Sequence, residues 1–219
     1  MPHTLTARAV LFDMDGTLVE STDAVTRVWA RFAAQSGVSL DHILATSQGV
    51  RMVETVRQHV PEGADVDAIV ADLSAWELHD HDGVKALPGA ADLLRVLPKT
   101  ALVTSAPRAL ALVRMEAAGL PIPEVVVTAD DVEFGKPRPD CYLLAAELLG
   151  VSASDCIVFE DAEAGVRAGL AAGATVVVVG DLDSAAAQGL IRVPDYSRVT
   201  VEAAGDGFTL TIDTGAARP

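Results

Sequence analysis

The chain contains little cysteine, few aromatic residues and no excess of basic ones. Of its 219 residues two are cysteines and 4% are aromatic. Cys141 falls in a predicted helix and Cys156 at the start of a predicted strand. We expect both to be small buried hydrophobic side chains rather than a disulfide or a pair of metal ligands.

Long hydrophobic runs are also absent from the sequence. No stretch reaches the length that a helix needs to cross a bilayer. The first residues, Met1-Pro2-His3-Thr4, lack the basic segment and apolar core of a secretory signal. We therefore expect a cytoplasmic protein with no membrane association.

Positive charge is scarce relative to negative charge. Sixteen Lys and Arg residues stand against 31 Asp and Glu residues, so the formal net charge is −15. Duplex nucleic acid is bound by a basic face that displaces counterions. We therefore expect no nucleic-acid partner.

Helical periodicity dominates residues 22–81. Val25, Val28, Trp29 and Phe32 recur at steps of three and four residues, which predicts one apolar stripe on a helix. The pattern repeats over 50–60 and 66–78, with Pro61-Glu62-Gly63 as the break between them. These helices interrupt an alternation of strands and helices, so we interpret them as an inserted cap, joined to the rest near residues 18–21 and 83–88.

The remainder of the chain predicts an α/β fold. From Leu87 onward, short apolar strands alternate with helices, which is typical of a parallel sheet covered by helices. The tail instead alternates with period two on both sides of Gly205-Asp206-Gly207, which indicates a β-hairpin. The predicted units are a Rossmann-like parallel-sheet core of residues 1–17 and 86–219, an α-helical cap of residues 18–85, and a C-terminal β-hairpin of residues 198–202 and 208–212.

Polar side chains follow four of the predicted strands. The crevice outside the carboxyl ends of parallel strands is where such sheets bind ligands. The four groups are Asp13 and Asp15 after strand 8–12, Thr104 and Ser105 after 100–103, Lys136 beyond 125–128, and Glu160 and Asp161 after 156–159.

Each group has a structural interpretation when it is taken singly. Thr104 could cap the helix that follows it, and Lys136 could be a solvated loop lysine. Glu160 and Asp161 could favour the start of the next helix, where negative charge is stabilising. The joint occurrence of all four in this order favours a catalytic site.

These motifs resemble those of the haloacid dehalogenase (HAD) superfamily of phosphohydrolases. The resemblance covers nearly the whole chain, including the cap region, the Ala86-Leu87-Pro88-Gly89-Ala90 return to the core and the Asp140-Cys141-Tyr142-Leu143-Leu144 helix. Within the superfamily the chain is most similar to sugar and polyol phosphatases, close to hexitol phosphatases and β-phosphoglucomutases.

The resemblance implies catalytic roles for four residues. Asp13 would be the nucleophile and form an aspartyl-phosphate. Asp15 would protonate the leaving alkoxide and then deprotonate the attacking water. Thr104 would donate a hydrogen bond to a phosphoryl oxygen, and Lys136 would place its charge on the same group and on Asp13.

The resemblance also implies a Mg²⁺ site. Its ligands would be the carboxylates of Asp13 and Asp161 and the backbone carbonyl of Asp15. Glu160 would hold a metal-bound water. Because the net charge of the chain repels phosphate at long range, bound Mg²⁺, Lys136 and one or two arginines must carry recognition locally.

Three further residues are candidates for substrate binding. Ser105 neighbours Thr104, and Arg51 stands where related enzymes carry a substrate-specificity loop. Arg108 closely follows the Thr104 strand end. Arg51 could equally pair with Glu54 on its own helix, and Arg108 could be an exposed residue of a first helical turn.

The function that follows is Mg²⁺-dependent hydrolysis of phosphate monoesters of sugars or polyols through an aspartyl-phosphate. The partner is then a small phosphorylated metabolite. A mutase of the β-phosphoglucomutase type is the alternative, because Arg51 and Arg108 could bind a second phosphate group of the substrate. A non-catalytic protein that binds a phosphorylated metabolite is a third interpretation, and the catalytic residues argue against it.

Overall fold

The computed structural model describes residues 2–213 of the chain, so the first residue and the last six of the predicted core lie outside the described residues. Its centre is a six-stranded parallel sheet with the strand order β6-β5-β2-β7-β8-β9. The strands are β2 (Ala9–Phe12), β5 (Thr100–Val103), β6 (Val125–Val127), β7 (Cys156–Glu160), β8 (Thr175–Val179) and β9 (Ile191–Val193).

Both faces of this sheet are covered, which explains why its strands are continuous apolar runs. Along β2, Val10 and Phe12 face one layer, while Ala9 and Leu11 face the other. The helices outside the cap region are α5 (Ala90–Val96), α6 (Arg108–Ala117), α7 (Asp140–Leu148) and α8 (Glu163–Ala171). Residues of α5 and α6 pack in the first layer and residues of α7 and α8 in the second. The predicted parallel α/β core is confirmed.

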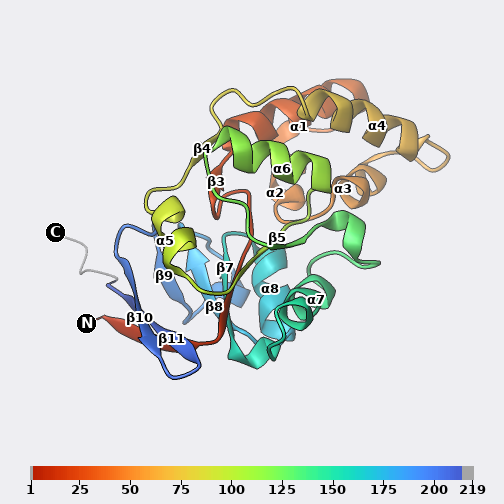
Figure 1. Cartoon of the computed structure of the whole chain (residues 1–219). Helices are drawn as coiled ribbons and strands as arrows, with labels where there is room; N and C mark the ends of the chain where they lie inside the picture. Colours follow the sequence, from red (N-terminus) through yellow and green to blue (C-terminus); the bar gives the residue numbers. More distant parts are fainter. Residues whose placement is uncertain (1, 214–219) are drawn as a thin grey trace.

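Four helices form the cap region, and they lie together at one end of the molecule (Figure 1). They are α1 (Thr22–Ser36), α2 (Leu40–Ser47), α3 (Met52–His59) and α4 (Val66–Glu77). Gly37, at φ 73°, ends α1, and the carboxylate of Asp65 accepts a hydrogen bond from the amide of Ala68 to begin α4. Their apolar stripes meet in a cluster of their own, built around Trp29 and Phe32.

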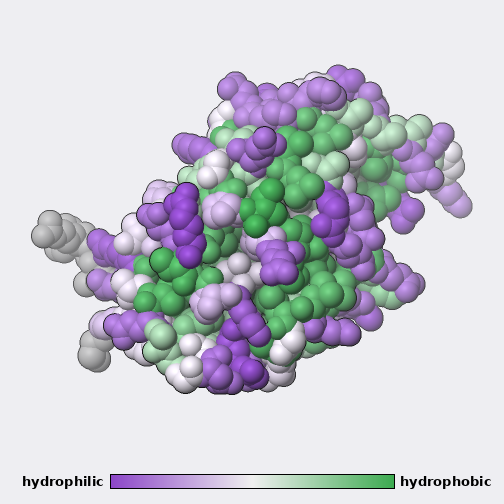
Figure 2. Space-filling model, in the orientation of Figure 1, coloured by the Kyte–Doolittle hydropathy of each residue, from purple (hydrophilic) through white to green (hydrophobic). Residues whose placement is uncertain are grey.

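Two short strands join the cap helices to the core. β3 (Val19–Glu20) precedes α1, and β4 (Lys85–Ala86) follows α4. They pair with each other antiparallel, so both connections pass side by side. The division at residues 18 and 85 stays a prediction, and this paired ribbon is the structural feature nearest to it. The outer surface of the cap is hydrophilic at the top of Figure 2, and hydrophobic residues gather toward the middle of the molecule.

The C-terminal hairpin is confirmed, but it belongs to a larger unit. β10 (Val199–Ala204) and β11 (Gly207–Ile212) are antiparallel partners, and β1 (His3–Ala7) pairs with the other edge of β11. β1 was not predicted from the sequence, because a five-residue strand with one buried position carries a weak local pattern. Phe208, Leu210 and Ile212 of β11 are buried against the first apolar layer of the sheet.

The remaining elements are short 3₁₀ turns, namely η1 (Ala129–Asp131), η2 (Ala153–Asp155) and η3 (Ala185–Ala187). Cys141 and Cys156 are free and buried, as expected. No helix within residues 2–213 combines the length and hydrophobicity required to span a bilayer.

Candidate active site

Three neighbouring strands bring the predicted residues to one edge of the sheet. β2 lies between β5 and β7, and all three are parallel. Asp13, Thr104 and Asp161, which directly follow these strands, all line one pocket. Strand order, which the sequence does not reveal, therefore places residues 148 positions apart beside each other.

Lys136 is the centre of a buried charge network. Its Nζ donates hydrogen bonds to Asp13 Oδ1 at 2.6 Å, to Glu160 Oε1 at 2.7 Å and to the carbonyl of Val103 at 3.2 Å. Burial disfavours the ammonium, but Asp13 and Glu160 hold the pKa of Lys136 well above its ordinary value. The lysine is therefore a fixed cation at the base of the site.

The contact with Lys136 does not fully compensate the cost of burying a negative charge on Asp13. Burial raises its pKa to about 8, because the favourable charge of Lys136 does not offset desolvation and the nearby charge of Glu160. Additional positive charge beside this carboxylate would favour its ionised form.

Glu160 is held at both carboxylate oxygens. Oε1 accepts a hydrogen bond from the Tyr142 hydroxyl at 2.8 Å, in addition to that from Lys136. Oε2 accepts from the amides of Asp161 at 3.0 Å and Ala162 at 3.1 Å. Gly165 makes this possible, since a Cβ there would lie 1.5 Å from Oε1 of Glu160. Neither Tyr142 nor Gly165 was predicted from the sequence to belong to the site.

The acidic groups fit a divalent cation. Oxygens of Asp13, Glu160 and Asp161 lie within 4.8 Å of one another. Three carboxylates face the single charge of Lys136, and the donor set consists of hard oxygen ligands. Burial and the neighbouring acids raise the pKa of Asp161 well above its ordinary value. Gly16, at φ +76°, leaves room for this carboxylate, because a Cβ would lie 2.1 Å from its Oδ2.

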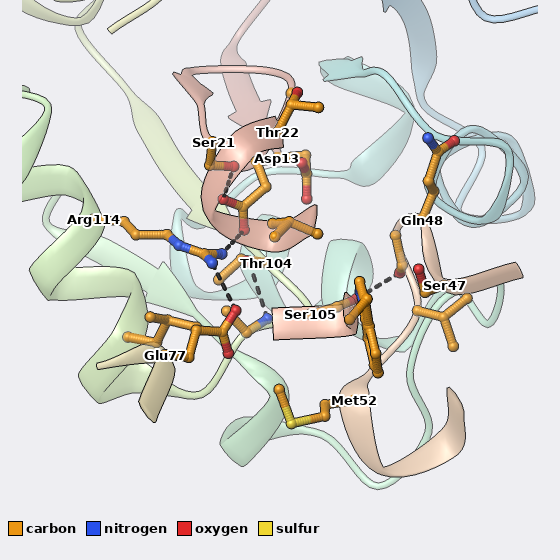
Figure 3. Close-up of a pocket in the computed structure, with 18 of the residues that line it drawn as sticks. Asp13, Ser21, Thr22, Ser47, Gln48, Met52, Glu77, Thr104, Ser105 and Arg114 are labelled. Carbon is orange, nitrogen blue, oxygen red and sulfur yellow. Dashed lines mark hydrogen bonds and ion pairs between the residues drawn. The ribbon is translucent and has the colours of Figure 1, made fainter. Parts of the chain in front are cut away.

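Asp15 points to a different set of partners. Its Oδ1 accepts a hydrogen bond from the Ser21 hydroxyl at 2.6 Å, and its Oδ2 accepts one from Arg114 Nη1 at 2.7 Å. Arg114 Nη2 in turn donates to Glu77 Oε1 at 2.6 Å. Ser21, Glu77 and Arg114 lie on one side of the pocket, opposite Gln48 and Ser47 (Figure 3). These contacts join the loop after β2 to Ser21, the residue before α1, and to α4 and α6.

Thr104 and Ser105 differ in what their hydroxyls contact. Thr104 is buried at the pocket, and its Oγ1 accepts a hydrogen bond from the amide of Ala106 at 3.1 Å. Ser105 Oγ donates to the carbonyl of Gly49 in the cap region at 2.7 Å. Ser105 therefore links the core to the cap, while Thr104 faces the space beside Asp13.

The structure does not bring Arg51 and Arg108 to the pocket. Arg51 Nε donates to Glu54 at 2.8 Å, and its Nη1 donates to the carbonyl of Glu133 at 3.1 Å. Arg108 donates to Asp131 at 2.8 Å and to the carbonyl of Val126 at 2.9 Å. Both guanidinium groups are occupied by core or helix partners in this arrangement.

The pocket has a volume of about 240 Å³ and lies between the cap helices and the sheet edge. Its cap side is partly apolar, with Val25, Trp29, Leu44 and Met52. Its polar groups include Thr22, Ser47 and Gln48 on the cap and the acids on the core. Such a space suits a small molecule with one charged and one polar, uncharged end.

Comparison with known proteins shows the family. A family model described as haloacid dehalogenase-like hydrolase matches residues 7–173. The chain belongs to the haloacid dehalogenase-like hydrolases. The resemblance noted in the sequence is thereby confirmed.

Relatives of this HAD-like hydrolase match most of its length. Hexitol phosphatase A of Escherichia coli (strain K12) is 45% identical over 179 residues, which cover 78% of this chain and 82% of the relative. Glycerol-1-phosphate phosphohydrolase 2 of Saccharomyces cerevisiae is 34% identical over an alignment that covers 92% of this chain and 90% of the relative. A solved HAD family hydrolase from Deinococcus radiodurans R1, with bound phosphate and sodium, has a TM-score of 0.61 at 34% identity and covers 85% of this chain and 90% of its own.

Within this HAD-like hydrolase, Arg114 and Glu77 are two further site residues that were not predicted from the sequence. A signal for both was present. Arg114 falls on the buried stripe of α6 with Leu110 and Met115, and Glu77 follows Leu73 by four residues on the buried stripe of α4. A charged residue on an apolar stripe is almost never fully buried unless it is paired.

Proposed function

We propose that this chain hydrolyses phosphate monoesters of sugars or polyols, with Mg²⁺, through a phosphorylated Asp13. The observation that carries the proposal is the placement of Asp13 at the pocket, bonded to buried Lys136 and near the acids Glu160 and Asp161. The 45% identity to hexitol phosphatase A of Escherichia coli supports the substrate class.

In the first step a carboxylate oxygen of Asp13 attacks the phosphorus atom. The bond between phosphorus and the oxygen of the alcohol breaks, and Asp15 gives its proton to the departing alkoxide. Asp15 enters this step protonated on Oδ1, because Oδ2 accepts a hydrogen bond from Arg114. The products are the free alcohol and an acyl phosphate on Asp13. Lys136 and the Thr104 hydroxyl stabilise the negative charge on the phosphoryl oxygens.

In the second step water attacks the phosphorus atom of the acyl phosphate. Asp15, now ionised, takes the proton of this water, and the bond between phosphorus and the Asp13 oxygen breaks. Inorganic phosphate leaves, and both carboxyl groups return to their starting states. One residue thus serves as acid and then as base.

Asp13 and Asp161 would hold Mg²⁺ by their carboxylates, together with the backbone carbonyl of Asp15. When bound, the ion would supply the positive charge that lets buried Asp13 ionise and that screens it from the phosphoryl oxygens. Glu160, fixed at both oxygens, would orient a water in the metal's shell.

The charges of the pocket favour an uncharged leaving group. Among the pocket-lining residues of the described chain, Arg114 is the single basic side chain, and it is bonded to two carboxylates. A second phosphate would find no free cation there. The hydroxyls of a polyol or sugar could instead bond to Gln48 and Ser47, with Trp29 against the carbon atoms of the substrate.

A β-phosphoglucomutase-type reaction is the alternative function. It would return the phosphoryl group to a bound sugar and would need a cation for a second phosphate. Arg51 and Arg108 would have to leave Glu54 and Asp131 to provide it. Hydrolysis needs no such rearrangement.

Phosphate release with Mg²⁺ tests the proposal. The panel contains sorbitol 6-phosphate, glycerol 1-phosphate, short-chain phosphates, and β-glucose 1-phosphate with and without glucose 1,6-bisphosphate. We expect release from the polyol phosphates, abolished by EDTA and by Asp13→Asn. Accumulation of glucose 6-phosphate without free phosphate would establish the mutase instead. Wild-type rates in Asp13→Asn would contradict the mechanism, and no turnover of any ester would contradict catalysis.

A further inference from the structure

Arg114 lies buried between two carboxylates that belong to different parts of the fold. It stands on α6, which follows β5 in the core, and is 2% exposed. Glu77 is the last residue of α4 in the cap and is 7% exposed. The guanidinium uses Nη1 for Asp15 and Nη2 for Glu77, as Figure 3 shows for Arg114 and Glu77.

The contact fixes the direction of the Asp15 carboxylate. Oδ2 accepts from Arg114 at 2.7 Å and Oδ1 bonds to Ser21 at 2.6 Å, so the carboxyl group cannot rotate without breaking a hydrogen bond. Asp15 itself follows a strand end in a loop and is part exposed, which leaves its side chain few other restraints. A proton donor that is fixed before the reaction avoids the loss of rate that misplacement by about 1 Å can cause, which can reach about 100-fold.

Glu77 explains why the guanidinium points toward Asp15. Burial raises the pKa of Glu77, and the charge of Arg114 opposes this rise. A buried carboxylate of this kind is stable only beside a charged partner. The third nitrogen of the Arg114 guanidinium, Nε, is buried with no hydrogen-bond partner in the described part of the chain. The two carboxylates therefore determine the orientation of the arginine.

We infer that Arg114 is a positioning residue for Asp15, and that Glu77 makes this positioning depend on the docked cap. The inference rests on the proposed function, in which Asp15 donates a proton to the leaving group. When α4 contacts α6, Glu77 accepts a hydrogen bond from Arg114 and fixes its guanidinium. Arg114 in turn fixes the orientation of the Asp15 carboxyl group. When the cap moves away, Arg114 loses one of its two acceptors, and Asp15 loses a fixed partner.

The leaving group separates this role from a purely structural one. An alkoxide leaves poorly and needs the proton of Asp15, whereas p-nitrophenolate leaves well without one. A variant that only loosens the cap or the core slows both esters alike. A variant that misdirects Asp15 slows the alkyl ester selectively.

The test compares kcat/KM of Arg114→Met and of the wild type for sorbitol 6-phosphate and p-nitrophenyl phosphate, both with Mg²⁺. This parameter covers the steps up to the breaking of the ester bond, so the later hydrolysis of the acyl phosphate does not enter it. We expect a fall of about 10- to 100-fold for sorbitol 6-phosphate and of less than about threefold for p-nitrophenyl phosphate. Equal falls for both esters, or no fall for either, would overturn the inference.

Two further variants keep the test decisive if Arg114→Met does not fold. The double variant Arg114→Met/Glu77→Met removes both buried charges together and is expected to show the same selective fall. Arg114→Lys keeps a cation that can reach Asp15 and is expected to recover part of the rate for sorbitol 6-phosphate alone. Loss of selectivity in these two variants would count against the inference in the same way.

Arg27→Met is the matched control. Arg27 holds Asp80 through two hydrogen bonds within the cap region, and it is not among the residues that line the pocket. Its removal is expected to change the two esters equally. A wild-type protein that releases phosphate from neither ester contradicts the proposed function, whereas an active wild type with an unselective Arg114→Met contradicts only the role of Arg114.

Discussion

Nζ of Lys136 lies 2.6 Å from Oδ1 of Asp13, and it holds Glu160 at nearly the same distance. Both acids and the lysine are buried. One ammonium thus fixes a residue after β2 and a residue at the end of β7 across two neighbouring strands. The relationship makes Lys136 a structural as well as a chemical part of the site.

Replacing this lysine should cost both stability and activity. In Lys136→Met, Glu160 and Asp13 lose their common cation, and removing one partner of a buried ion pair typically costs about 3–5 kcal/mol. We expect a loss of this order in the free energy of unfolding from urea titration, together with loss of phosphate release. Arg138→Met is the control, because its ion pair with Asp140 is largely exposed and should change stability by less than about 1 kcal/mol. Equal losses in the two variants would argue against a central role for Lys136.

Divalent cations should stabilise the protein through the acidic cluster. At a Mg²⁺ concentration about 100 times the dissociation constant, binding to the folded state adds about 2.7 kcal/mol. We expect thermal unfolding to move to higher temperature with Mg²⁺, and Asp161→Asn to lose most of this shift. Glu163→Gln should retain it, since Glu163 forms an exposed pair with Arg167. An undiminished shift in Asp161→Asn would place the cation elsewhere.

The metal-free protein should lose stability as the pH rises. The pKa of Asp13 is raised by burial from 3.8 to about 8 in the folded state. The folded state therefore binds more protons than the unfolded state between about pH 4 and pH 8, so the contribution of Asp13 to stability falls across that window. Below the unfolded pKa this contribution is complete.

Asp13→Asn isolates this contribution. In EDTA the variant should show a smaller decrease in the free energy of unfolding between pH 5 and pH 8 than the wild type does. Urea titrations at the two pH values measure the difference. If the wild type and the variant lose stability in parallel, Asp13 is not the group responsible.

The hydroxyl of Ser105 should affect substrate binding through the cap. It donates to the carbonyl of Gly49 in the cap region, and both residues line the pocket. A hydrogen bond of this type contributes about 0.5–1.5 kcal/mol. Ser105→Ala is expected to raise KM by about two- to tenfold while kcat changes less. Ser36→Ala removes a similar bond, from Ser36 Oγ to the Phe32 carbonyl, away from the pocket, and should leave KM unchanged. A large fall in kcat for Ser105→Ala would point to direct contact with the phosphoryl group.

Local patterns predicted the elements that carry the chemistry. The apolar runs before Asp13 and Glu160 form central strands with both faces buried, and such strands are readable because nearly every residue is hydrophobic. Three of the cap helices, α1, α3 and α4, were predicted from their periodicity, and the hairpin from its alternation about Gly205. Each of these signals lies within about a dozen consecutive residues.

Other features depended on partners distant in the sequence. β1 forms because it pairs with the free edge of β11, some 200 residues later in the chain. The five residues of β1 do not by themselves specify a strand. Arg51 was open to two interpretations. In the structure it donates hydrogen bonds to Glu54 and to the carbonyl of Glu133, and a role in substrate binding stays a prediction. Arg114 looked like an ordinary helix residue until α4 supplied Glu77.

The sequence by itself determined which residues could do chemistry and at which strand ends they stand, because a strand and the turn after it are specified by adjacent residues. Tertiary structure alone decided which of them meet. The order of the parallel strands placed Asp13, Lys136 and Glu160 in contact, and the packing of α4 on α6 joined Glu77 to Asp15 through Arg114. Charge pairs in a buried site form across elements that the chain separates, so only the folded arrangement of those elements shows them.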